Sequence, residues 1–238
     1  MKKVIVLLSF IFLLVGCGKK SDEIVMVTEA GFAPYEFYEN GEVIGVDIEI
    51  SKKIADKLGK KLVIKDVAFD SIINELNSGK ADFAAAGMSI NPERSEKVDF
   101  SIEYITSNQV VVVKEDSDIK SIDDIKDKRI SVQLGTVADT YVTKNYKDAK
   151  INRLKKFLVA AEDVKNNKSD CIVMDAIPAN ELVKSNPELK VLDGILFQDK
   201  YGMAVKKGNK ELLNSINLVL EELIKDGKID EYIIKFSE

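Results

Sequence analysis

The sequence predicts an α/β protein made of two similar lobes, and three observations lead to this prediction. Short apolar runs of strand type alternate with segments whose apolar residues recur at helical spacing, which is typical of a mostly parallel sheet flanked by helices. The same alternation returns in the second half of the chain. A run of four valines, residues 110–113, stands between the two halves and is expected to carry the chain from one lobe to the other.

The N-terminal segment is typical of an export signal. Two lysines precede an apolar run, residues 4–15, which is too short to cross a bilayer as a permanent helix. The run ends in Leu14-Val15-Gly16-Cys17, which resembles a bacterial lipobox. We therefore expect a signal peptide at residues 1–16 and a tether at 17–23, lipidated on Cys17 and held at the outer face of the cell membrane. The alternative is a plain secretory signal.

The first half of the chain supplies most of one lobe. Residues 24–28 are typical of a buried strand, and residues 35–44 of a hairpin that turns at Asn40-Gly41. An apolar residue at every fourth position from Val46 predicts a helix that ends at Gly59. A strand, a helix and a second strand then follow, and we place them at residues 61–67, 70–77 and 82–86.

The second half repeats this order of elements. Strands and helices alternate after the valine run, at about residues 129–132, 137 onward, 151, 159–166 and 170–174. A strand at 203–206, a helix at 210–225 and a short terminal helix then rejoin the first lobe. The predicted division is lobe 1 at residues 24–107 and 202–238, lobe 2 at 108–201, and hinge crossings near 105–110 and 197–201.

Composition excludes several classes of function. The 35 basic and 40 acidic residues are mixed along the chain without a basic stripe, so no nucleic acid is expected as partner. Histidine is absent, which removes serine-histidine-aspartate triads, cysteine-histidine pairs and histidine metal sites. No metal or organic cofactor is expected. Cys171 lies in an apolar run and is expected to be a buried, unpaired thiol.

A set of short motifs follows a fixed order between residues 22 and 238. The motifs are Glu29-Ala30-Gly31-Phe32-Ala33-Pro34-Tyr35, Gly45-Val46-Asp47, Ala86-Gly87-Met88-Ser89 through Pro92-Glu93-Arg94, Val98-Asp99-Phe100-Ser101, Gly135-Thr136, Met174-Asp175 and Tyr201-Gly202. In order and spacing they resemble the polar amino acid family of bacterial extracellular solute-binding proteins, the receptors of ABC importers. The resemblance implies a two-lobe periplasmic-binding-protein (Venus-flytrap) fold with two hinge strands. It also implies a monomer that closes around one amino acid and delivers it to a permease and its ATPase.

Two charged residues suit the backbone groups of a free amino acid, which needs a cation and an anion at matched positions. Arg94 can hold a carboxylate through two parallel hydrogen bonds of its guanidinium. Asp175 follows the apolar run 171–174, at the carboxyl end of a predicted strand, where α/β sheets place their ligands. The plainer alternatives are a surface helix residue for Arg94 and a helix N-cap for Asp175.

The resemblance implies further contacts with the ligand. They are the backbone at Ala86 and Gly87, the hydroxyl of Ser89, and Thr136, where a helix N-cap could direct backbone N–H groups at a carboxylate. Both hydroxyl residues could instead serve only a turn or a cap. Phe32 and Phe69 match aromatic positions that pack on the ligand side chain, although phenylalanine is more often a core residue.

Selectivity for the ligand side chain is expected from Glu29, Gln133 and Met174. A carboxylate at Glu29 in a mostly apolar chamber favours a cationic or amide group. Glutamine binders of the family tend to have a lysine at the position of Gln133 and a histidine at that of Met174, and this chain has neither. The candidates are arginine, lysine, histidine, glutamine and cystine, with glutamine weakened by this departure.

Two other functions remain open. Dehydratases and cell-wall lytic enzymes have relatives of this fold, so an enzyme is an alternative, with Glu29 as the candidate general acid. A free-standing co-receptor that senses an amino acid is a second alternative. Our expectation is a binding protein without enzymatic activity.

Overall fold

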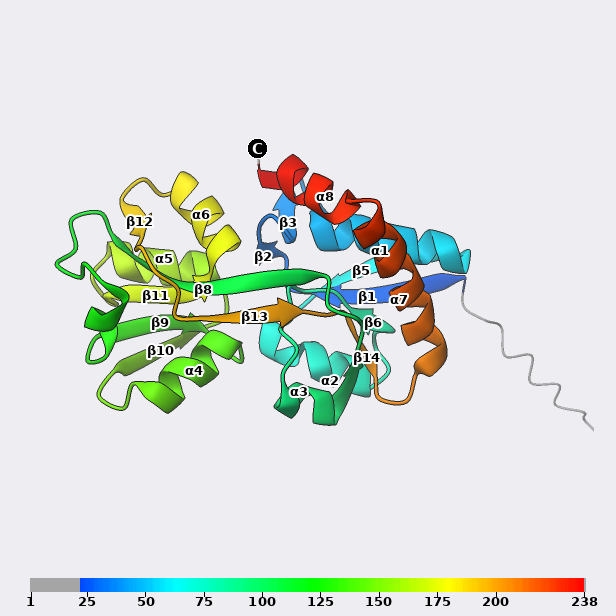
Figure 1. Ribbon diagram of the computed structural model, residues 1–238, viewed down its shortest axis with the longest axis horizontal. Coiled ribbons are helices and arrows are strands. Elements are labelled where there is room, and N and C mark those ends of the chain that lie inside the picture. The colour runs from blue at the N-terminus through cyan, green and yellow to red at the C-terminus, as the bar shows by residue number, and fades with distance from the viewer. Residues whose placement is uncertain (1–21, 238) are drawn as a thin grey trace, which may run out of the picture.

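The computed structural model describes residues 22–237, and the predicted signal peptide and Cys17 lie outside this range. Two α/β lobes lie side by side and are joined by two long antiparallel strands (Figure 1). Within the described residues, no helix has the length and apolar character that a membrane span requires.

The first lobe is built on a five-stranded sheet in the order β5-β1-β6-β14-β7. Its strands are β1 (Glu23–Thr28), β5 (Lys61–Asp66), β6 (Phe83–Ala84), β7 (Val98–Phe100) and β14 (Ala204–Lys206). Side chains of β1 alternate between two apolar clusters, one shared with α1 (Val46–Leu58) and α7 (Lys210–Lys225), the other with α2 (Ile72–Asn77). This alternation is why the strand is apolar throughout. The last helix, α8 (Lys228–Ser237), packs on α1 and α7.

The second lobe repeats the plan with the order β10-β9-β11-β8-β12. Its strands are β8 (Ile105–Lys114), β9 (Arg129–Gln133), β10 (Lys150–Leu154), β11 (Cys171–Asp175) and β12 (Leu189–Val191). Helices α5 (Phe157–Lys165) and α6 (Ala176–Lys184) share one apolar cluster with the sheet, and α4 (Val137–Asn145) shares the other. Cys171 is a free, buried thiol in this core, as predicted.

Each sheet is mostly parallel and contains one reversed strand. In the first sheet β14 runs against both of its neighbours, and in the second sheet β8 does the same. Both reversed strands occupy the fourth position, and both continue from a crossing between the lobes. The predicted fold class is therefore confirmed, with the reversal explained by the direction from which the chain enters each lobe.

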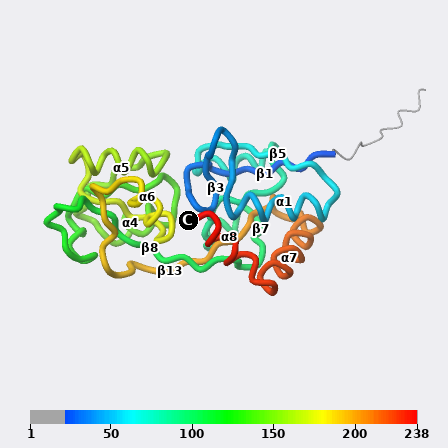
Figure 2. Tube along the Cα trace, turned by 90° about the horizontal axis from the view of Figure 1, so that it is seen from above, coloured from blue at the N-terminus to red at the C-terminus, as the bar shows by residue number. Residues whose placement is uncertain are grey.

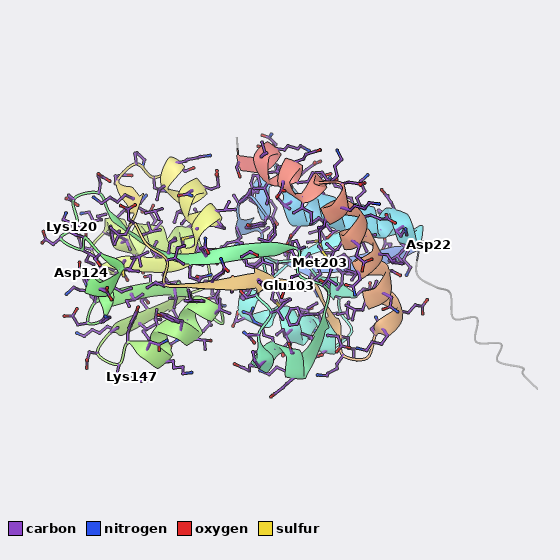
Figure 3. All side chains as sticks on the ribbon, viewed as in Figure 1. Asp22, Glu103, Lys120, Asp124, Lys147 and Met203 are labelled. Atoms are coloured by element: carbon purple, nitrogen blue, oxygen red, sulfur yellow. The ribbon has the colours of Figure 1, made fainter. Side chains whose placement is uncertain are left out.

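The crossing consists of the first half of β8 and of β13 (Phe197–Tyr201), paired antiparallel from Ile105 opposite Tyr201 to Gln109 opposite Phe197. Figure 2 shows the two strands running together from one lobe to the other. In Figure 3, Glu103 and Met203 lie where these strands reach the first lobe, while Lys120, Asp124 and Lys147 lie far out on the second.

The four valines do not form the crossing itself. They lie inside the second sheet, where Val113 is opposite Cys171 and Val110 is opposite Met174. All four are buried, and successive valines belong to opposite faces of the sheet. A run of four apolar residues is typical of a strand with both faces covered, which explains the position.

Local turn and capping signals predicted several elements correctly. The hairpin of β3 (Glu36–Glu39) and β4 (Glu42–Ile44) turns at Asn40 and Gly41, both with positive φ. Helix α1 ends at Gly59 in the left-handed conformation, as expected of a C-terminal glycine.

Four elements had no clear signal. These are β2 (Gly31–Phe32), α3 (Pro92–Lys97), α6 and β12, together with the short 3₁₀ turns at Phe69–Ser71 and Ile122–Ile125. The first two are too short for a periodic pattern, and α6 contains Pro178, which a helix accepts only in its first turn.

Candidate ligand-binding site

A narrow cavity of about 10 Å³ lies between the lobes, at the carboxyl ends of β1, β6, β9 and β11. This edge is where parallel α/β sheets place ligands. Its lining comes from both lobes and consists of Glu29, Phe32, Glu36, Phe69, Ala86, Gly87, Ser89, Arg94, Gln133, Thr136, Val137, Phe157 and Asp175. The structure thus brings together all residues that were expected to contact the ligand, except Met174.

Arg94 is the cation of this cavity. The N-cap Asn91 accepts a hydrogen bond from the Arg94 backbone and starts α3, which directs the side chain inward, where it is buried. Nη1 donates to the carbonyl of Ser89 (2.7 Å) and Nη2 to that of Gly135 in the other lobe (2.9 Å). Burial lowers the pKa of Arg94 to about 10, which still leaves it charged at neutral pH.

The guanidinium of Arg94 has no carboxylate within 4 Å among residues 22–237. Its ring neighbour is Phe69, whose centroid lies 5.2 Å from Cζ. A guanidinium carries five N–H donors, and two of them are used by the carbonyls. The remaining donors can hold an incoming carboxylate.

Asp175 is the matching anion. It ends β11 and starts α6, and its Oδ1 accepts hydrogen bonds from Ser107 Oγ (2.6 Å) and from the hydroxyl of Tyr201. Both donors come from the crossing strands, so the carboxylate is fixed by the hinge. Burial raises the pKa of Asp175. A cation placed beside it would favour the ionised form.

Asp199 is a second carboxylate near this position that sequence reasoning missed. Its Oδ2 accepts from Ser89 Oγ (2.9 Å) and from Gln109 Nε2 (3.3 Å), while its Oδ1 is buried without a donor among the described residues. Burial and the neighbouring Asp175 raise the pKa of Asp199 to about 7. No sequence pattern indicated that Asp199 faces the cavity. Its side chain is directed inward by the pairing of β13 with β8, which a local pattern does not report.

Glu29 follows β1 and is engaged by the second lobe. Its Oε2 accepts from Gln133 Nε2 (3.0 Å), and its Oε1 lies 3.2 Å from Lys156 Nζ. Gln133 also donates to the carbonyl of Lys155. Burial raises the pKa of Glu29, and the two partners oppose that shift.

Aromatic rings close the opposite wall. Phe32 stacks on Phe157 of the second lobe with centroids 5.7 Å apart, and it also packs against Tyr35. Phe157 was not expected at the site, although it begins α5. The stack leaves an apolar wall across which an extended side chain can lie.

The backbone at Gly87 is already occupied in this state. Its N–H donates to Asp47 Oδ2 (3.0 Å), and its positive φ suits glycine. A Cβ at this position would meet the Phe32 ring at 2.7 Å. Close approach of the chain to the aromatic wall therefore requires glycine here.

Thr136 caps α4 as predicted. Its Oγ1 accepts from the backbone of Asp139 (3.2 Å) and donates to the carbonyl of Gln133 (2.8 Å). The start of α4, including Val137, lines the cavity beside Arg94. The partial positive charge of a helix N-terminus thus lies next to the guanidinium.

Met174 does not line the cavity, which corrects the expectation that it contacts the ligand. Its side chain is buried in the core with α5 and α6, behind Phe157. Successive residues of a strand point to opposite faces, so Met174 faces away from the side that Asp175 faces.

Within residues 22–237, no group of three or more cysteine, aspartate or glutamate side chains is arranged to hold a metal ion.

The comparison with protein families agrees with this geometry. A family model described as bacterial extracellular solute-binding proteins, family 3, matches residues 24–238. The chain is similar to the arginine-binding extracellular protein ArtP of Bacillus subtilis (strain 168), with 30% identity over 237 residues that cover 92% of this chain and 91% of that protein.

Two solved structures extend the likeness to the fold. One, described as an ancestral arginine-binding protein bound to arginine, has a TM-score of 0.85 at 42% identity and covers 90% of this chain and 98% of that one. The other is the ancestral amino acid-binding protein AncCDT-1, described as a precursor of cyclohexadienyl dehydratase, with a TM-score of 0.85 at 34% identity over 91% of this chain and 96% of that one.

Proposed function

The chain belongs to family 3 of the bacterial extracellular solute-binding proteins, and on that premise we propose that it binds a cationic amino acid, arginine first, for delivery to an ABC importer. The observation that carries the proposal is Arg94: a buried guanidinium with no carboxylate partner among residues 22–237, in the same cavity as Asp175. A buried charge is costly unless it is paired. The α-carboxylate and α-ammonium of an amino acid would supply partners for both residues.

The charge of the cavity supports a cationic ligand. Glu29, Glu36 and Asp175 line it, against Arg94 as the lining cation. Once the backbone groups of the ligand pair with Arg94 and Asp175, the remaining wall is acidic and aromatic. A guanidinium suits both features, since it pairs with carboxylates and stacks on rings. Relatives named for arginine binding support the same choice.

Closure of the lobes is the proposed mechanism. Contacts from Arg94 to Gly135 and from Glu29 to Gln133 already join the two lobes across the cavity. The ligand would enter between separated lobes, pair first with Arg94 of the first lobe, and be covered when the second lobe brings Asp175 over it. A permease would then recognise the closed form.

Calorimetry on protein that has been unfolded and refolded to remove carried-over ligand tests the proposal. Arginine should bind with the lowest Kd among the common amino acids and cystine, and it should raise the melting temperature by several degrees at about one hundred times Kd. If glutamate or an apolar amino acid binds more tightly than arginine, the assignment to cationic amino acids is wrong.

We propose that the protein binds its ligand and catalyses no reaction on it. Glu29, the candidate general acid, is engaged by Gln133 and Lys156 of the opposite lobe, an arrangement that suits a contact between lobes. Arginine recovered from the purified protein after long incubation should be chemically unchanged. A new product in the mass spectrum, absent with the Glu29→Gln variant, would revive the enzyme alternative.

We also propose that Cys17 anchors the protein by lipid, on the strength of the Leu14-Val15-Gly16-Cys17 motif. The mature protein would then act at the outer face of the membrane. Expressed in a bacterial host with a labelled fatty acid, the protein should carry the label and partition into detergent. Cys17→Ala should lose both properties, and label that persists in this variant would refute the site.

A further inference from the structure

One acidic side chain of the cavity stands apart from the others. Glu36 begins β3, directly opposite Phe32 on β2, so both side chains point from the same face of the hairpin into the cavity. Glu36 is 1% exposed, and neither of its carboxyl oxygens has a hydrogen-bond donor among residues 22–237.

The other two acidic groups in the lining are satisfied. Glu29 has Gln133 and Lys156, and Asp175 has Ser107 and Tyr201. No cation lies within 4 Å of Glu36 in the described part of the chain. Glu36, which the sequence did not single out, is therefore the lining carboxylate that has neither a cation nor a hydrogen-bond donor among residues 22–237.

A second carboxylate lies behind it. Asp47 of α1 is fully buried and accepts hydrogen bonds from the backbone of Gly87 (3.0 Å) and from the hydroxyl of Tyr104 (2.8 Å). The acidic groups that face Glu36 are Asp47 first, then Glu29 and Asp175. Two buried carboxylates in contact cannot both be ionised without a cation, so the pair retains a proton.

The pKa values agree with a shared proton. Burial and then the charge of Asp47 raise the pKa of Glu36 well above its usual range, and burial raises that of Asp47 to about 6. A proton held on Glu36 can be donated to Asp47, which agrees with the raised pKa of Glu36.

We propose that Glu36, backed by Asp47, selects a cationic ligand side chain, and that this cation displaces the proton that the pair holds in the empty cleft. The inference deepens the proposed function and rests on it. The exchange is balanced: the protonated pair becomes two carboxylates, one proton leaves to solvent, and the positive charge of the ligand replaces it. A neutral side chain of the same shape cannot do this, so the proton stays.

Arginine and citrulline separate this step from the rest of binding. They share the α-carboxylate, the α-ammonium and the length of the side chain, but only arginine carries a guanidinium. Proton changes at Asp175 or Asp199 caused by the α-ammonium occur with both ligands. The difference in proton release between the two ligands therefore reports the side-chain end alone.

The experiment is calorimetry of both ligands at pH 7 in two buffers with different ionisation enthalpies, which counts the protons released. In the unaltered protein, arginine should release up to about one proton more than citrulline and bind at least about tenfold more tightly. Glu36→Gln should abolish the extra proton and most of the preference. Glu39→Gln, the same change at the exposed end of β3, should keep both the extra proton and the preference.

Folding of the variant does not limit the test. Glutamine is the neutral isostere of a protonated glutamate and retains a donor for Asp47, so Glu36→Gln should melt near the unaltered protein. Asp47→Asn gives a second measurement: its amide can donate to Glu36, which should then be ionised before binding. It should lose the extra proton while keeping the preference for arginine.

The outcomes distinguish a failure of the proposed function from a failure of the role assigned to Glu36. If arginine does not bind the unaltered protein, the proposed function fails. If arginine binds and Glu36→Gln leaves both the extra proton and the arginine preference unchanged, the function stands and the role of Glu36 is refuted. An equal loss of affinity for both ligands would reduce Glu36 to a structural contact between the hairpin and α1, which also refutes it.

Discussion

Two charged side chains of the first lobe reach across the cleft, and they differ in what they find there. Glu29 meets a cation and an amide, Lys156 at 3.2 Å and Gln133 at 3.0 Å. Arg94 meets the carbonyl of Gly135 at 2.9 Å and, among the described residues, no carboxylate. The protein thus neutralises one charge by itself and leaves the other for a ligand.

This difference distinguishes contacts that hold the two lobes together from contacts that are left for the ligand. A contact such as Glu29 with Lys156 stabilises the closed form whether or not a ligand is present. The pairing of Arg94 is completed only when a carboxylate arrives. Under the proposed function, the ligand shifts the equilibrium between open and closed forms through Arg94, because a ligand acts only through its differential affinity for the two states.

The largest expected effect is at Arg94. Arg94→Lys keeps the charge but removes the planar fork, so at least one charge-assisted hydrogen bond to the ligand carboxylate is lost. Such a bond contributes about 1.5–3 kcal/mol, which corresponds to a Kd for arginine raised by roughly 10- to 150-fold. Calorimetry measures the change.

Glu93→Gln is the matched control for that variant. Glu93 is the neighbour of Arg94 on α3 and forms an exposed ion pair with Lys97 (2.8 Å). Exposed pairs contribute little, so Kd should stay within about twofold of the unaltered value. An equal loss in both variants would mean that α3 as a whole, and not the guanidinium, supports binding.

A smaller effect is expected at Lys156. Lys156→Met leaves Glu29 without its cation across the cleft, and the empty protein should populate the open form more, by about 1 kcal/mol for a half-exposed pair. Small-angle scattering should report a larger radius of gyration without ligand. Lys155→Met, at the exposed neighbouring lysine, should behave as the unaltered protein. The same radius in all three proteins would show that this contact does not hold the cleft closed.

The sequence predicted which charged side chains line the cavity better than it predicted their partners. Asp175 could be placed at the cavity from its position at the end of a predicted strand, whereas Arg94 was placed there by the family resemblance. Glu29 was correctly placed on the cavity wall. Its partners Gln133 and Lys156 lie more than a hundred residues away, and no local pattern reports such a contact.

Other differences follow from side-chain direction. Asp175 in the cleft already implies that Met174 faces the core, so period-two alternation could have excluded Met174. Glu36 and Asp199 could not be found in this way. Each is turned toward the cavity by pairing of its strand with another, β3 with β2 and β13 with β8.

The smallest predicted effect concerns Asp199, the carboxylate that lies near Asp175. Its pKa of about 7 exceeds that of an unfolded aspartate, so the folded state binds more protons between about pH 4 and 7. Stability of the empty protein should therefore fall as pH rises through this window and level off above it. Asp199→Asn removes the titrating group.

The melting temperature of the variant should therefore rise relative to that of the unaltered protein between pH 5 and pH 8, by a few degrees, since about 1 kcal/mol corresponds to roughly 2–4 °C in a chain of this size. Calorimetric melting between pH 5 and 8 measures the slope, and that range avoids the carboxylates with lowered pKa, Asp99 and Asp170. Arginine at saturation should flatten the slope in the unaltered protein, because its ammonium stabilises the ionised pair of Asp175 and Asp199. A slope that is the same in both proteins would mean that Asp199 is ionised throughout the range and that the negative charge near Asp175 is already balanced by Arg94.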